Sequence, residues 1–132
     1  MKLVPYLHFN ENCEEALITY AKIFNGTIGQ INRFDNPAYP VADHYKDKIM
    51  HTELTFGDNT IMLSDVMPGS SAGDGNNIAI SIGLGDQDET IAVFDQLAEN
   101  GHIVVPLERQ FWGSWFGEVV DRFGIRWMLM CG

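Results

Sequence analysis

The chain has 132 residues, of which 45% are hydrophobic and 20% charged, the size and composition of one globular domain. With 8 Lys and Arg against 18 Asp and Glu, the formal net charge is −10, which opposes binding to nucleic acid and to anionic membranes. We therefore expect neither partner. Because no apolar run approaches the roughly 18 residues of a membrane span, we also expect a cytoplasmic protein.

The first part of the chain predicts a strand, a helix and three further strands. The helix begins at Asn12, whose side chain can cap it while Glu15 reaches back in a capping box, and it ends at Asn25-Gly26. Gly57-Asp58-Asn59 joins the last two strands as a hairpin. The predicted strands are residues 3–9, 27–34, 48–56 and 60–65.

The rest of the chain repeats this order. The second helix begins near Asp86 or Asp88 and ends at Asn100-Gly101, where we expect glycine to take the left-handed conformation. Arg122-Phe123-Gly124 joins the last two strands. The predicted strands are residues 77–84, 102–107, 114–121 and 125–130.

A weak internal repeat supports a duplication. Asn25-Gly26-Thr27-Ile28 recurs 75 positions later as Asn100-Gly101-His102-Ile103. We interpret the chain as a single domain, 1–132, of two βαβββ modules, 1–66 and 77–132, joined by a Gly-, Ser-, Pro- and Asp-rich linker at 67–76. Chance similarity between such short strings is the alternative interpretation.

Strand alternation assigns side chains to the two faces of each predicted strand. One face is apolar and should cover a helix; its members are Leu3, Leu7, Phe9, Met50, Leu54, Phe56, Ile78, Ile80, Ile82 and Leu84. The opposite face is small or polar and includes Tyr6, His8, His51, Glu53, Ser81 and Gly83. Such a face predicts a curved sheet that encloses a ligand cavity, although a solvated face is the simpler alternative.

Six strings resemble, in order and spacing, the vicinal-oxygen-chelate superfamily, to which glyoxalase I, bleomycin-resistance proteins and extradiol dioxygenases belong. They are Val4-Pro5-Tyr6-Leu7 with Asn12-Cys13-Glu14-Glu15-Ala16-Leu17, Met50-His51-Thr52-Glu53-Leu54, Met62-Leu63-Ser64-Asp65, Phe111-Trp112-Gly113, and Gly117-Glu118-Val119-Val120-Asp121-Arg122-Phe123-Gly124-Ile125-Arg126-Trp127. The last is the most specific. Within the superfamily, the chain resembles the PhnB-like branch, also labelled as a 3-demethylubiquinone methyltransferase domain.

The resemblance implies an α+β fold in which two βαβββ modules form a cupped mixed sheet, completed in a homodimer. It implies no particular reaction. The methyltransferase label has little support in the chain, because no glycine-rich loop follows a first strand with an acidic residue after the next.

Metal enzymes of the superfamily place ligands on the first and fourth strands of each module. Carried over by resemblance, the fourth-strand positions are Met62 and Met128, and the first-strand positions lie at or beside Pro5 and Asn77. None is a usual ligand of a hard divalent metal. We therefore expect no metal at this position and no cofactor.

Candidate site residues gather on the polar face. His51 and Glu53, two residues apart, could form a base and its orienting acid, or, with His8, a displaced metal triad; a structural hydrogen bond of His51 is the alternative. Asp65 could bind a ligand or cap a turn, and Trp112 and Trp115 could line a pocket or a dimer core, whereas Trp127 should pack against a helix. The candidate ligand-binding residues are Tyr6, His8, Met62, Ser64, Asp65, Trp112, Trp115 and Met128.

Three functions are compatible with this pattern. The leading hypothesis is a protein that binds a small molecule in the cup without the usual metal site. The second is an enzyme, either a His51-based lyase or isomerase or a dioxygenase with a displaced metal. The third is a dimeric interaction module whose cup is vestigial. Cys13 and Cys131 have no metal-site spacing and are expected to be free thiols.

Overall fold

A computed structural model describes residues 1–73 and 75–132 of the chain; Asp74, within the predicted linker 67–76, lies outside the described residues. Two compact units divide the chain, Met1–Gly73 and Asp74–Gly132. The helices are α1 (Cys13–Ile23) and α2 (Gln87–Ala98), with a short 3₁₀ helix at Asp43–Tyr45. The strands are β1 (Tyr6–Phe9), β2 (Thr27–Ile28), β3 (Asn32–Arg33), β4 (Ile49–Phe56), β5 (Asn59–Asp65), β6 (Ile80–Leu84), β7 (His102–Arg109), β8 (Trp115–Val120) and β9 (Arg126–Cys131).

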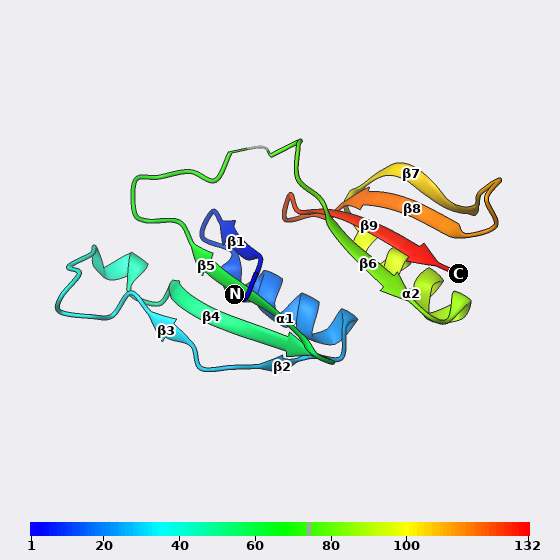
Figure 1. Cartoon of the computed structure of the whole chain (residues 1–132). Helices are drawn as coiled ribbons and strands as arrows, with labels where there is room; N and C mark the ends of the chain where they lie inside the picture. Colours follow the sequence, from blue (N-terminus) through cyan, green and yellow to red (C-terminus); the bar gives the residue numbers. More distant parts are fainter. Residues whose placement is uncertain (74) are drawn as a thin grey trace. The chain divides into compact units, whose positions relative to one another are not determined.

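Both units have the same sheet topology. The strand order is β1-β5-β4-β2 in the first unit, where β3 also pairs with β4, and β6-β9-β8-β7 in the second. In each, the first strand runs parallel to the last, and the other pairs are antiparallel. Figure 1 shows the helix of each unit lying against its own sheet. The prediction of an α+β fold with two βαβββ modules is confirmed.

The strand registers align the two units residue by residue. Tyr6 lies beside Met62 on the neighbouring strand, as Ser81 lies beside Met128. On the other side of each methionine stands a glutamate, Glu53 opposite Met62 and Glu118 opposite Met128. The duplication therefore reaches the level of single side-chain positions.

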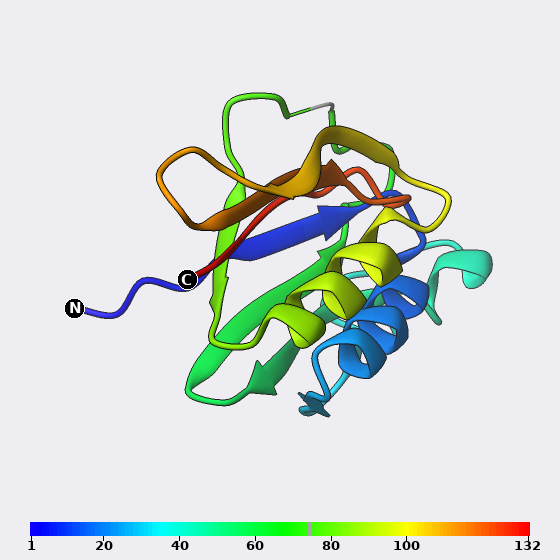
Figure 2. The same cartoon turned by 90° about the vertical axis from the view of Figure 1, so that its right-hand side faces the viewer.

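Each unit has its own hydrophobic core between helix and sheet. In the first unit, Leu17 and Tyr20 of α1 and Leu54 and Leu63 of the sheet are fully buried. In the second, Phe94 and Leu97 of α2 are buried with the sheet residues Val119, Trp127 and Leu129. Figure 2 shows the two helices from a second direction. Burying each large side chain stabilises its unit by roughly 1.5–3 kcal/mol.

The repeated Asn-Gly pairs end both helices, but not as expected. The left-handed residues are Asn25 and Asn100, with φ of 50° and 57°. The glycines are needed for close approach instead: a Cβ on Gly101 would lie 2.4 Å from the carbonyl oxygen of Val120, and one on Gly26 would lie 2.9 Å from Leu54 Cδ1. The prediction of a left-handed glycine was wrong because asparagine also tolerates that conformation.

Several predicted strand ends were also wrong. β1 and β6 begin only where their ladders with β5 and β9 begin, so Leu3 and Ile78 lie outside the sheets; Ile78 is 76% exposed. Residues 27–34 form β2 and β3 rather than one strand, because Gly29 separates two short pairings with β4. Among the described residues, neither helix has the length and hydropathy to cross a membrane.

Candidate functional site

The helix-free face of the first unit carries six side chains that strand alternation selects. Their neighbours Phe9, Leu54 and Leu63 are buried on the opposite face, and the Phe9 ring lies 6.4 Å from that of Tyr20 on α1. We call this surface the polar face. It consists of Tyr6 and His8 on β1, His51 and Glu53 on β4, and Met62 and Ser64 on β5.

Two hydrogen-bonded pairs in ring contact form a group that we call the tyrosine–histidine cluster: Tyr6, His8, His51 and Ser64. The hydroxyl of Tyr6 lies 2.8 Å from Nδ1 of His51, and Nδ1 of His8 lies 3.0 Å from Oγ of Ser64. The Tyr6 ring stacks on His8 at 4.9 Å and lies 5.6 Å from His51. Hydroxyl groups thus orient both imidazoles through Nδ1, and neither Nε2 has a partner in the described part of the chain.

Glu53 and Met62 lie side by side next to this cluster. The Glu53 side chain is half-buried, and within residues 1–73 and 75–132 it has neither an ion pair nor a hydrogen bond. A carboxylate in this state gains most from a ligand that brings a cation or an N–H or O–H donor. The polar face therefore offers imidazole nitrogens, an aromatic ring, a thioether and an uncompensated carboxylate.

The helix-free face of the second unit is mostly apolar. Its members are Ser81 and Gly83 on β6, Phe116 and Glu118 on β8, and Arg126, Met128 and Met130 on β9. Its two charges neutralise each other, because Arg126 Nη1 donates to Glu118 Oε2, with side chains only 21% and 15% exposed. Met128 thus lies far along the chain from the tyrosine–histidine cluster, on a face of different chemistry.

The predicted tryptophan residues have three different environments. Trp115, a candidate pocket residue, is the first residue of β8 and pairs with Cys131, so it shares the helix-covered side with Leu129 and does not lie on the helix-free face. Trp112 is 56% exposed in the β7–β8 turn, edge-on to Phe111. Trp127 is fully buried on the helix side, as predicted, and its Nε1 donates to Asp121.

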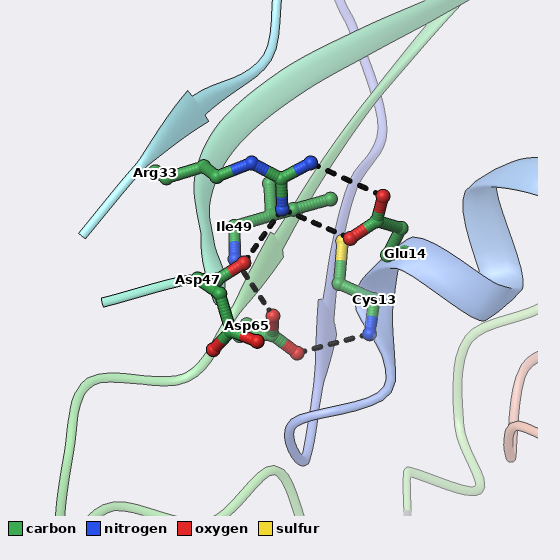
Figure 3. A network of polar contacts seen from close by, with 6 residues as sticks. All are labelled: Cys13, Glu14, Arg33, Asp47, Ile49 and Asp65. Atoms are coloured by element: carbon green, nitrogen blue, oxygen red, sulfur yellow. Dashed lines mark hydrogen bonds and ion pairs between the residues drawn. The ribbon is translucent and has the colours of Figure 1, made fainter. Parts of the chain in front are cut away.

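Asp65 lies away from the polar face. Its two carboxylate oxygens accept from the backbone N–H groups of Cys13 and Ile49, both at 2.9 Å, and the side chain is buried (Figure 3). This carboxylate takes the place that we predicted for the side chain of Asn12, which makes no capping hydrogen bond to α1. Asp65, on β5, thus links α1 to β4 through its carboxylate. It does not lie with the other candidate ligand-binding residues.

Burial around Asp65 shifts two pKa values. The pKa of the Cys13 thiol is raised well above its ordinary value, first by burial and then by the carboxylates of Asp65 and Glu14. The pKa of Tyr45 is raised by burial and by Asp65; its hydroxyl donates to the carbonyl of Val66. Both groups stay protonated at neutral pH, which fits structural roles.

An ion pair lies at the surface beside Asp65 (Figure 3). Arg33 contacts both carboxylate oxygens of Glu14, at 2.9 and 3.1 Å, and also donates to the carbonyl of Asp47. The hydrogen bond to Arg33 lowers the pKa of Glu14. This contact fastens β3 to the first turn of α1.

The side chains at the superfamily's metal positions do not fit a hard divalent metal. Met62 and Met128 are thioethers, and the Pro5 carbonyl already accepts from the Met62 N–H. The register puts Ser81, not Asn77, beside Met128, because β6 begins after Asn77. Across the described ranges, no group of three His, Cys, Asp or Glu side chains is arranged to hold a metal.

Comparison with known proteins identifies the family. The family model described as 3-demethylubiquinone-9 3-methyltransferase matches residues 1–130. The chain belongs to this family. One relative of this chain is protein YjdN of Escherichia coli K12, which is 29% identical over 98% of this chain and 94% of that protein. The crystal structure of protein PA1353 from Pseudomonas aeruginosa is 39% identical over 99% of this chain and 97% of that chain, with a TM-score of 0.89.

More distant structures show the fold of this family. The PhnB protein from Bacillus cereus is 24% identical with a TM-score of 0.82, each chain being covered completely at 100%. The fosfomycin resistance protein FosX from Mesorhizobium loti and the lactoylglutathione lyase from Agrobacterium tumefaciens have TM-scores of 0.63 and 0.61, at 11% and 15% identity. The predicted resemblance to the PhnB-like branch and to the glyoxalase fold is confirmed.

Sequence reasoning missed the Glu118–Arg126 ion pair. Both residues lie within the string that carried the resemblance, but only the register shows that Glu118 occupies the position of Glu53. A signal was present in the residues that stand two positions before Met62 and Met128, which are Thr60 and Arg126. Comparing the residues at these two positions would have shown an arginine in the second module and none in the first.

Proposed function

We propose that this protein binds a small organic molecule on the polar face, without a metal at the superfamily's usual position. The tyrosine–histidine cluster is the observation that carries the proposal. Its hydrogen bonds fix two imidazoles in place before any ligand arrives, which lowers the entropic cost of binding. The equivalent positions of the second unit hold Gly83 and Phe116, so the scaffold itself does not require these polar groups.

The arrangement suits a ligand that spans two rows of side chains. One row runs His8–Ser64 and includes the imidazole of His51; the other runs Tyr6–Met62–Glu53. The first row supplies imidazole nitrogens that can form hydrogen bonds, and the second supplies an aromatic ring, a polarisable thioether and a carboxylate. A ligand with a polar end and an apolar body matches both rows.

A second candidate function is catalysis by His51. The Tyr6 hydroxyl orients the imidazole at 2.8 Å, as a third group orients the base of a catalytic triad. This favours a lyase or isomerase that uses Nε2 of His51 as general base. For the dioxygenase alternative, we expect an equimolar metal in protein purified without a histidine tag, and its loss in the His51→Ala variant.

We also propose that the protein is a homodimer. Phe111 is 96% exposed at the tip of the β7–β8 hairpin, with Trp112 beside it, and β7 is an edge strand of its sheet. Exposed aromatic rings and open strand edges are typical of surfaces that associate. Light scattering should give twice the monomer mass at micromolar concentration, and a monomer mass would contradict the proposal.

We also propose that this protein acts in a reducing compartment. Cys13 and Cys131 are both free and buried. Buried free thiols are typical of proteins that work in the cytoplasm, which is where we propose that this protein acts. Cell fractionation tests this directly.

A thermal-shift screen against a metabolite library tests the binding function. A ligand of the polar face should raise the melting temperature in a saturable way. Tyr6→Phe, which removes only the hydroxyl that holds His51, should weaken such a ligand about fivefold to tenfold. Tyr39→Phe is the matched control, because Tyr39 is an exposed tyrosine outside the sheet. Equal affinities for both variants would contradict the proposed site.

A further inference from the structure

The second unit contains a cation beside its glutamate, which the polar face of the first unit lacks. We use this arrangement as a template for the first unit. Glu53 and Glu118 occupy equivalent positions, each opposite a methionine of the neighbouring strand. Glu118 is neutralised by the guanidinium of Arg126, which reaches it along the same helix-free face. The duplicated scaffold thus shows where a cation sits when it satisfies this glutamate.

The first unit has no such arginine. Arg126 pairs with Val120 and precedes Met128 by two residues; its equivalent, Thr60, pairs with Thr55 and precedes Met62 by two. A threonine side chain is neutral and too short to reproduce the guanidinium contact. The Glu53 side chain is half-buried, and its carboxylate has no cation or N–H donor as a partner in the described ranges 1–73 and 75–132.

We propose that the polar face takes an organic cation, with a guanidinium or ammonium group on Glu53 in the place that Arg126 has in the other unit. This inference rests on the proposed function, because it names the chemical class of ligand for the same face. The body of the ligand lies on Met62 and on the ring of Tyr6, which stand in the same row as Glu53.

Two further observations favour a cation. Tyr6 presents an aromatic ring beside Met62 where the second unit has only Ser81, and a ring face attracts a nearby cation. The formal net charge of −10 raises the local concentration of cations around the whole protein and repels anions. The imidazole nitrogens of His8 and His51 then remain for the uncharged polar groups of the ligand.

Three probes of similar size separate charge from shape: n-butylguanidinium, the neutral n-butylurea and the anion pentanoate. Each is titrated into the full chain and followed by backbone amide NMR. We expect n-butylguanidinium alone to shift the amides of β1, β4 and β5 in a saturable way. Glu53→Gln should weaken its binding at least about tenfold. Glu99→Gln makes the same change in net charge at the end of α2 and should leave binding unchanged.

A gain-of-arginine variant tests the template itself. Thr60→Arg should place a guanidinium on Glu53 and abolish n-butylguanidinium binding, whereas Thr60→Gln, long but neutral, should retain it. The amide spectra show whether each variant is folded.

The outcomes separate this inference from the proposed function. Saturable shifts of the polar-face amides by n-butylurea or pentanoate, with none by the cation, would overturn the cation and leave a binding face. Unchanged affinity in Glu53→Gln or in folded Thr60→Arg would also overturn it. If none of these probes or the metabolites of the thermal screen reaches this face, both proposals are wrong.

Discussion

The two units share a strand order and a glutamate–methionine pair, yet present different chemistry on their helix-free faces. In the first unit, hydroxyls and imidazoles form a connected cluster and Glu53 is uncompensated. In the second, the same positions hold Gly83, Phe116 and Met130, and the glutamate is paired with Arg126. The two helix-free faces thus differ around a glutamate–methionine pair that both units share, and the positions that differ are where we look for function.

The helix ends provide the strongest test of the shared scaffold. Gly101→Ala should destabilise the protein by about 3 kcal/mol, because the new Cβ meets a backbone carbonyl that cannot yield. Gly26→Ala should cost less, about 2 kcal/mol, since its Cβ would lie 2.9 Å from the side chain of Leu54 and 3.0 Å from the carbonyl oxygen of Thr55, both longer than the contact at Gly101. Urea unfolding measures both. Gly85→Ala, with open space around it, is the control and should change little; equal losses at Gly26 and Gly101 would contradict the close-approach argument.

The units also differ in how the helix N-terminus is held. Asp65→Asn should cost about 2–3 kcal/mol, because it removes charge from two buried hydrogen bonds to remote backbone N–H groups. In the second unit, Asp86 caps α2 locally through the N–H of Glu89, so Asp86→Asn should cost less than about 1 kcal/mol. The denaturant midpoints of the two variants measure these losses of stability. A larger loss for Asp86→Asn than for Asp65→Asn would contradict this prediction.

Removing Arg126 should make the second face resemble the first. Arg126→Thr should cost about 2 kcal/mol, because a mostly buried Glu118 loses its charged partner. Removing both charges in Arg126→Thr/Glu118→Gln should restore part of that loss, as in a double-mutant cycle. An additive double variant would show that the two side chains do not interact.

The smallest expected effect is at the surface pair of Arg33 and Glu14. Arg33 lowers the pKa of Glu14, so the pair stabilises the fold above the usual carboxyl pKa of 4.5 and loses its effect as pH falls through the lowered value. Both side chains are substantially exposed, which limits the contribution to a few tenths of a kcal/mol. Urea midpoints of the protein and of Arg33→Gln should differ slightly at about pH 7 and coincide at about pH 2. A difference that persists in acid would assign the effect to packing or to the hydrogen bond that Arg33 donates to the Asp47 carbonyl.

Local patterns predicted the elements of this fold and one face of its first sheet. Alternation placed His51 and Glu53 together and opposite the core, and the second helix was expected to begin near Asp86 or Asp88, because both inferences involve residues close in sequence. Alternation failed for Ile78, because this residue precedes the first pair of the parallel ladder between β6 and β9, which is Ile80 with Trp127.

Contacts between distant segments could not be predicted in this way. Asp65 bonds to Cys13 and Ile49, which are remote in the chain, so its position at a strand end gave no sign of either partner. The hydrogen bond between Tyr6 and His51 requires the register of three strands, which a single sequence does not contain.

The buried thiols of the two units have a practical consequence. Cys13 belongs to the first unit and Cys131 to the second, and burial protects each from reaction. A thiol reagent can modify either residue only when the surrounding structure opens. Mass spectrometry of the two cysteine peptides after timed alkylation therefore reads the opening of each unit separately, within one unaltered protein.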